Sequence, residues 1–285
     1  MIKDLPLKVL HLHTFKCAGT TFSWILEKIF SSQVLYVESS NSSARLSWQR
    51  VEQSLDLQPY RALTSHLIDC PPPGELAALK VSFVRKPWDR YQSAFRFVRD
   101  VQHKLPQETS FRHYMESQYK GILANFQSRH LSPQGLQGFQ FRQGWQLRPD
   151  LIDMDRVDLF VGVVERFDES LVALEHHFQA LGLPSDLSYA APLNTRSPGA
   201  LASDSAVVAD DVSLDSMPSW ILNMLELDQS LWIRACQSLD RQIVEIPDFE
   251  GKLNSFRERC LRLSSDCDLV NSISVQPPAR WVYLD

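Results

Sequence analysis

The 285-residue chain lacks any run of about 18 or more consecutive apolar residues, so no segment is expected to span a membrane as a helix. Its start, from Met1 to Pro6, also lacks the apolar core and small-residue cleavage site of a signal peptide. We therefore expect a cytoplasmic protein. The five cysteines are scattered, odd in number and without a CxxC pair, which favours reduced thiols over a disulfide framework.

An excess of positive charge is missing as well. The chain has 34 acidic and 29 basic residues, a formal net charge of -5. This balance argues against nucleic acid as a partner, because a broad basic face would supply most of that affinity. Any anion site must therefore be local. No heptad run or clear exposed apolar strip stands out, so the oligomeric state stays open.

The sequence does contain a regular alternation of strand-like and helix-like segments. Short apolar and β-branched runs predict strands at 7–13, 34–37, 61–64, 79–84 and 159–164. Helical periodicity predicts five helices: one that starts at about Thr20, one at 44–55, one after Pro87, one that starts at Asp168, and one at 231–243. The alternation predicts an α/β fold, a P-loop-like parallel β-sheet flanked by helices on both faces. We expect one domain over 1–285, with lid-like loops or insertions near 127–149 and 190–218.

The first predicted strand runs into a turn that is typical of an anion site. The segment reads His13-Thr14-Phe15-Lys16-Cys17-Ala18-Gly19-Thr20-Thr21. Amides at a helix N-terminus carry partial positive charge and have no partner within the helix, so they favour a phosphate or sulfate. Lys16 adds a full charge, and Gly19 permits close approach of the backbone. The hydroxyl groups of Thr20 and Thr21 can donate hydrogen bonds to the same anion.

The turn resembles the 5′-phosphosulfate loop of the Golgi-type and bacterial carbohydrate sulfotransferases, which usually reads HxPKTGGT. Phe15 stands where that family has proline, and Cys17-Ala18 where it has Thr-Gly. A nucleoside-triphosphate P-loop would instead read GxxxxGK[ST]. Here the lysine precedes the glycine, so the order differs from that of an ATP or GTP site.

A second segment, from Val81 to Phe95, resembles the 3′-phosphate element of the same family, a strand ending in RDPxxRxxSxY. Arg85 and Ser93 occupy the matching positions, and Lys86 replaces the acidic residue of the family. An arginine at a strand end can fork onto a phosphate, and a serine on the next helix can donate to the same group. The segment therefore predicts a second anion site.

Further segments resemble elements of the family in the same order along the chain. Ser65-His66 resembles its Gly-His pair, and Asn125 to Arg129 resembles its NxQ[ST]R element. Val161 to Leu171 resembles its VGxxERFDESL stretch, and Leu193 to Arg196 resembles a late basic loop. The resemblance covers about residues 8–245. It implies a sulfotransferase that uses 3′-phosphoadenosine-5′-phosphosulfate (PAPS), closest to the heparan sulfate 2-O-like enzymes. The implied acceptor is a hydroxyl group, with a carbohydrate as the expected class.

The resemblance also implies roles for individual residues. The expected catalytic residues are Lys16, which would stabilise the leaving group, and His66. The residues expected to bind the 5′-phosphosulfate are Lys16, Cys17, Ala18, Gly19, Thr20 and Thr21. The residues expected to bind the 3′-phosphate are Arg85 and Ser93. His66 suits a general base because imidazole titrates near neutrality, although a histidine at a strand end is often a structural hydrogen-bonder. Glu165 and His13 are alternative bases. No metal is expected.

Two other functions remain open at this point. A nucleotide-dependent kinase of P-loop type would require magnesium and would bind ATP. A non-catalytic nucleotide-binding protein would keep the fold without turnover. The identity of the acceptor cannot be read from the sequence, because the loops that would select it follow few physical rules.

Overall fold

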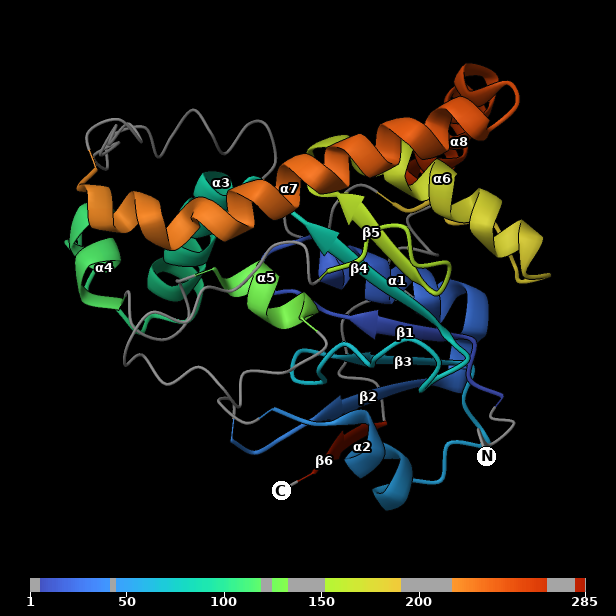
Figure 1. The fold of residues 1–285 in the computed structure, drawn as a ribbon, viewed down its shortest axis with the longest axis horizontal. Coiled ribbons are helices and arrows are strands. Elements are labelled where there is room, and N and C mark those ends of the chain that lie inside the picture. The colour runs from blue at the N-terminus through green and yellow to red at the C-terminus, as the bar shows by residue number, and fades with distance from the viewer. Residues whose placement is uncertain are drawn as a thin grey trace.

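The computed structural model describes residues 6–41, 45–118, 125–132, 152–190, 217–265 and 280–284. Their centre is a six-stranded sheet with the order β5-β4-β1-β3-β2-β6 (Figure 1). Its strands are β1 (Val9–Leu12), β2 (Val34–Glu38), β3 (Ala62–Ser65), β4 (Leu79–Val84), β5 (Leu159–Val163) and β6 (Trp281–Tyr283). All five pairings between neighbours are parallel. The predicted α/β class with a parallel sheet is therefore confirmed.

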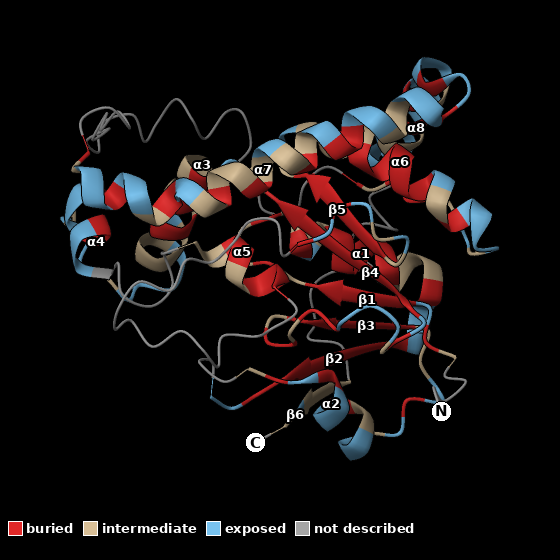
Figure 2. Cartoon of the chain, viewed as in Figure 1, coloured by how far each residue is buried: buried red, intermediate tan, exposed pale blue. Residues whose placement is uncertain are grey.

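The strands are mostly apolar because the sheet is covered on both faces. Every residue of β1 to β5 is buried, whereas the edge strand β6 is only partly covered (Figure 2). Strands buried on two faces read as continuous apolar runs rather than as alternating patterns. This explains why the first five strands could be recognised from short apolar segments.

Helices connect the strands and form the two outer layers. They are α1 (Gly19–Phe30), α2 (Trp48–Ser54), α3 (Pro87–Arg96), α4 (Phe111–Gln118), α5 (Phe126–Leu131), α6 (Phe167–Ala180), α7 (Ser219–Glu245) and α8 (Phe249–Ser265). In Figure 1, α1 lies behind the sheet, while α5 and α7 lie in front of it. Pro87 occupies the first turn of α3, where proline costs no helical hydrogen bond. No helix in the described ranges has the length and apolar composition to cross a bilayer.

Three features differ from the sequence expectation. The loop expected over 127–149 begins as a helix, because α5 covers Phe126–Leu131. The helix expected over 231–243 is longer and starts at Ser219. Helix α8 and strand β6 were not anticipated, and β6 has only three residues whose partner strand lies near the other end of the chain. The remainder of the two expected loops, 133–149 and 191–216, lies outside the described residues.

Candidate functional site

The carboxyl ends of neighbouring parallel strands lie along one edge of the sheet, and most of the predicted site residues follow these ends. His13 and Lys16 follow β1, Glu38 is the last residue of β2, His66 follows β3, and Arg85 follows β4. Because β4, β1, β3 and β2 are consecutive neighbours in the sheet, the topology brings these residues to a common edge (Figure 1). Ligand sites of open α/β sheets form at this edge.

The start of α1 has the features of an anion cradle. Its N-cap residue, Ala18, makes no side-chain cap, and the first turn contains no acidic residue. The amides of Gly19, Thr20 and Thr21 therefore face outward without a partner inside the helix. Thr20 is exposed and Thr21 is half-buried, so both hydroxyl groups can reach a ligand at this point. Lys16 (φ 63°) and Ala18 (φ 59°) adopt the left-handed conformation that shapes the turn.

Gly19 is required by the close approach of His13. A Cβ atom at residue 19 would overlap the His13 imidazole. The His13 ring also stacks on His66, with centroids 3.8 Å apart, and on His11, with centroids 5.1 Å apart. Burial holds the pKa of His13 well below its ordinary value, and the neighbouring histidines act in the same direction. An imidazole with so low a pKa is a weak proton acceptor, which disfavours His13 as the base.

Cys17 is the one member of the predicted cradle whose polar groups are already used. Its backbone N–H donates to the Thr14 carbonyl (3.2 Å), and its thiol donates to Oε1 of Gln127 (3.4 Å). Burial raises the pKa of the thiol to about 12. These bonds show that Cys17 holds the turn in shape, and its expected contact with the donor remains a prediction.

Lys16 and Arg85 bring two positive charges to the site. Lys16 is half-buried, and its Nζ lies 4.3 Å from the centre of the Phe97 ring. Burial lowers the pKa of Lys16, and the nearby charge of Arg85 lowers it further. Within the described ranges, no carboxylate lies within ion-pair distance of either cation. Ser93 is expected to bind the same phosphate as Arg85. It is half-buried on α3, which starts two residues after Arg85.

Gln127 fixes the backbone that carries Arg85. Its Oε1 accepts from the Arg85 N–H (2.7 Å), and its Nε2 donates to the Arg85 carbonyl (2.9 Å). Asp228 on α7 accepts from the N–H groups of Gln127 (3.1 Å) and Ser128 (2.8 Å) and so holds the start of α5. The motif around Gln127 is visible in the sequence, but nothing there distinguishes Asp228 from any other acidic residue on a long helix.

His66 is held by a carboxylate that the sequence analysis also missed. Oε1 of Glu38 lies 2.8 Å from Nδ1 of His66 and accepts from the His66 backbone N–H at 3.0 Å. A carboxylate only accepts, so in the neutral ring Nδ1 carries the proton and Nε2 presents a lone pair. Arg45 supports the following segment by donating to Asp69 (2.8 Å) and to the His66 carbonyl (3.3 Å). The available signal was an acidic residue directly after the apolar run 34–37.

Glu165, the other alternative base, has both oxygens engaged. Oε1 accepts from the Lys86 N–H (2.8 Å) at the start of α3, and Oε2 accepts from the indole of Trp232 (3.0 Å). A proton acceptor with two structural donors is a poor base. The geometry therefore favours His66 among the three candidates.

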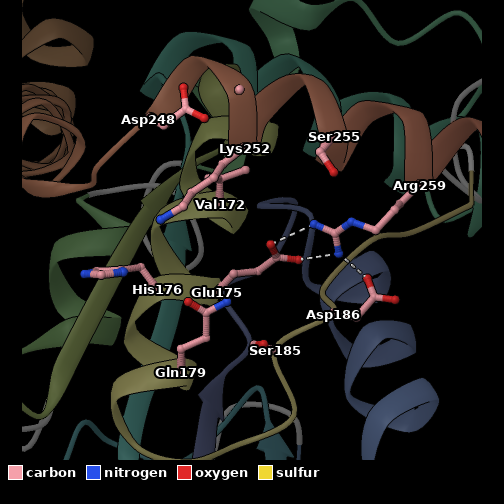
Figure 3. A pocket seen from close by; sticks show the side chains of 11 residues that line it. Val172, Glu175, His176, Gln179, Ser185, Asp186, Asp248, Lys252, Ser255 and Arg259 are labelled. Atoms are coloured by element: carbon pink, nitrogen blue, oxygen red, sulfur yellow. Dashed lines mark hydrogen bonds and ion pairs between the residues drawn. The ribbon is translucent and has the colours of Figure 1, made fainter.

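A polar pocket of about 470 Å³ lies elsewhere, between α6 and α8 (Figure 3). Arg259 reaches across it and forks onto Glu175 with bonds of 2.9 and 2.8 Å, and it also pairs with Asp186. None of the residues that line this pocket follows β1, β2, β3 or β4. The pocket is thus separate from the residues that the sequence analysis selected.

Neither a protein-family model nor a curated protein sequence matches the chain. Among solved structures, a sulfotransferase from Alicyclobacillus acidocaldarius is 13% identical with a TM-score of 0.39, over 82% of this chain and 98% of its own. Mouse sulfotransferase SULT7A1, complexed with PAP, is 13% identical with a TM-score of 0.37, over 94% and 88% respectively. Likenesses this distant decide nothing about the activity, which has to be inferred from the side chains at the strand ends.

Proposed function

We propose that the chain is a PAPS-dependent sulfotransferase that moves a sulfuryl group to a hydroxyl acceptor, with a carbohydrate as the acceptor class that the sequence resemblance favours. The observation that carries the proposal is the pair Lys16 and Arg85, which lack a carboxylate partner in the described part of the chain. They come from the adjacent strands β1 and β4. The donor has anionic groups at its 5′ and 3′ positions, so two separate cations fit its charge.

The start of α1 fits the 5′ end of this donor. Its first amides have no side-chain cap, and Lys16 supplies a nearby full charge. Arg85, with its backbone clamped by Gln127, is assigned to the 3′-phosphate together with Ser93. A 3′-phosphate site distinguishes PAPS from ATP, because ATP has a hydroxyl group at that position.

The residues divide the chemistry as follows. His66 accepts the proton of the acceptor hydroxyl through Nε2 while the acceptor oxygen forms its bond to sulfur. The bond between sulfur and the bridging oxygen of the 5′-phosphate breaks, and its electron pair remains on that oxygen. Lys16 and the amides of Gly19 and Thr20 stabilise this charge. As in phosphoryl transfer, positioning and electrostatics supply most of the acceleration.

Isothermal calorimetry with 3′-phosphoadenosine-5′-phosphate (PAP) and with Mg-ATP tests the proposal first. We expect PAP to bind and Mg-ATP to bind weakly or not at all. Arg112→Ala is the matched control for any loss of charge, because Arg112 is an exposed cation on α4 paired only with Glu116 in the described structure. Binding of Mg-ATP without PAP would replace the proposal with the kinase function.

Turnover is tested with radiolabelled PAPS and a panel of oligosaccharides, lipids and small alcohols. We expect transfer to at least one sugar hydroxyl, and the Lys16→Ala variant should remain folded without transferring sulfate. PAP binding without transfer to any acceptor by the wild-type chain would favour the non-catalytic nucleotide-binding function. The single domain and the lid role of the two expected loops remain predictions.

A further inference from the structure

Glu38 makes two contacts with one residue, and together they fix the orientation of that residue. The same oxygen, Oε1, accepts from the backbone N–H of His66 (3.0 Å) and from its ring Nδ1 (2.8 Å). The side chain of Glu38 is 11% exposed and that of His66 is 36% exposed. A charge-assisted hydrogen bond is strong when its acceptor is this well buried. The imidazole therefore cannot turn about its χ angles without losing a bond to the carboxylate.

The face of the His66 ring is held by a second group. The His13 ring stacks on it, with an interplanar angle of 28°. Burial keeps the pKa of His13 well below its ordinary value, so the stacked ring stays neutral and does not repel a proton arriving at His66. The Glu38 carboxylate prevents rotation of the His66 ring within its own plane, and the stacked His13 imidazole prevents the ring from tilting out of that plane. The partial exposure of His66 leaves it accessible to a ligand.

Glu38 in turn is held by the strand at the edge of the sheet. Its backbone carbonyl accepts from the Leu284 N–H (2.8 Å), and Glu38 is the register partner of Tyr283 in β6. The ladder between β2 and β3 ends at Tyr36, two residues before Glu38. Strand β6 thus supplies the backbone contact at the end of β2 that β3 does not.

We propose that Glu38 is a positioning residue, supported by β6, that holds His66 in its Nδ1–H tautomer so that Nε2 is the proton acceptor. The inference rests on the proposed function for the meaning of that proton transfer. The tautomer itself can be measured without any donor or acceptor present. A purely structural role for Glu38 would require only a folded turn and would not depend on which ring nitrogen carries the proton.

Nitrogen-15 NMR of histidine-labelled protein reads the tautomer directly, with the His66 signals assigned from their loss in His66→Asn. In wild type we expect the Nδ1–H form. Glu38→Gln keeps an acceptor oxygen and should retain that form, whereas Glu38→Ala should lose it. The exposed His113 on α4 is an internal control whose signals should not change. An Nε2–H ring in wild type, or an Nδ1–H ring in Glu38→Ala, would overturn the inference.

Kinetics separates the positioning role from the proposed function. For Glu38→Ala we expect kcat to fall roughly 100-fold, as a misplaced catalytic group does, with unchanged PAP affinity as evidence that the variant is folded. Glu38→Gln should recover most of the rate. Transfer that persists in Glu38→Ala overturns the role of Glu38 alone. Absence of transfer in wild type overturns the proposed function and, with it, the catalytic meaning of the tautomer.

Discussion

The strand-end site and the pocket between α6 and α8 both contain cationic side chains, but these cations differ in whether a carboxylate pairs with them. In the pocket, Arg259 is neutralised by Glu175 and Asp186 (Figure 3). At the strand ends, Lys16 and Arg85 have no carboxylate in ion-pair range among the described residues. Charge that is already paired stabilises the fold, whereas a partly buried cation without a carboxylate partner favours an external anion. The comparison therefore favours the strand ends over the pocket as the place where an external anion binds.

Two half-buried lysines show the same contrast in their pKa values. Burial lowers the pKa of both Lys16 and Lys28. At Lys28, the carboxylate of Asp186 opposes this effect from 3.5 Å, and the amino group also donates to the Ser188 carbonyl at 2.6 Å. At Lys16, the charge of Arg85 adds to the effect of burial instead. A bound anion would oppose that contribution at Lys16, as the Asp186 carboxylate opposes burial at Lys28.

The largest expected effect is on Lys16. Lys16→Ala should lower kcat for sulfuryl transfer by roughly 100- to 1000-fold, the usual loss when one stabiliser of developing charge is removed. Initial rates with radiolabelled PAPS measure it. Lys28→Ala removes the same charge from α1 at a paired position and should leave kcat unchanged. Equal losses of kcat in Lys16→Ala and Lys28→Ala would show that the rate depends on net charge and not on whether the lysine is paired with a carboxylate.

Arg85 should have the next largest effect, on binding rather than on rate. Arg85→Ala should weaken PAP binding by roughly 10- to 100-fold, because it removes charge-assisted hydrogen bonds to a phosphate. Calorimetry with PAP and with adenosine 5′-phosphate checks this, and the variant should no longer prefer the ligand that carries a 3′-phosphate. Gln127→Ala should reduce the same preference less, since it loosens only the Arg85 backbone. A preserved preference in Arg85→Ala would remove the 3′ site from this edge.

The parts of the site that could be predicted are local in sequence. The strand, turn and helix around Lys16 lie within one short segment, and Arg85 follows a fully buried, mostly apolar strand. The contact between Glu38 and His66 depends on β2 and β3 becoming neighbours in the sheet, which no local pattern specifies. Asp228 acts across about a hundred residues on α5. The placement of Lys16 and Arg85 after strand ends was therefore predictable, whereas the contacts made by Glu38 and Asp228 were not.

A substitution in the pocket between α6 and α8 should change the stability of the fold and leave sulfuryl transfer unchanged. Arg259→Ala leaves Glu175, which is 10% exposed, without its forked partner. We expect a loss of about 1–2 kcal/mol in the free energy of unfolding, discounted because Arg259 itself is partly in solvent. Urea denaturation measures this loss. PAP affinity and kcat should stay at their wild-type values, and a selective loss of either would mean that this pocket belongs to the functional site.

Ala18 provides the smallest and sharpest test, because it concerns the backbone alone. A non-glycine residue in the left-handed conformation costs about 1–2 kcal/mol, and Ala18 has φ 59° and ψ 15°. Ala18→Gly relieves this strain but gives the unfolded chain more freedom, so the net gain in unfolding free energy should be below about 1 kcal/mol. Ala180→Gly, the same change at the exposed last residue of α6, relieves no strain and should instead destabilise by at most the ~0.5–1 kcal/mol that glycine costs inside a helix. Opposite signs in urea denaturation would show that the turn at the strand ends stores strain to direct its amides, and equal signs would show that it does not.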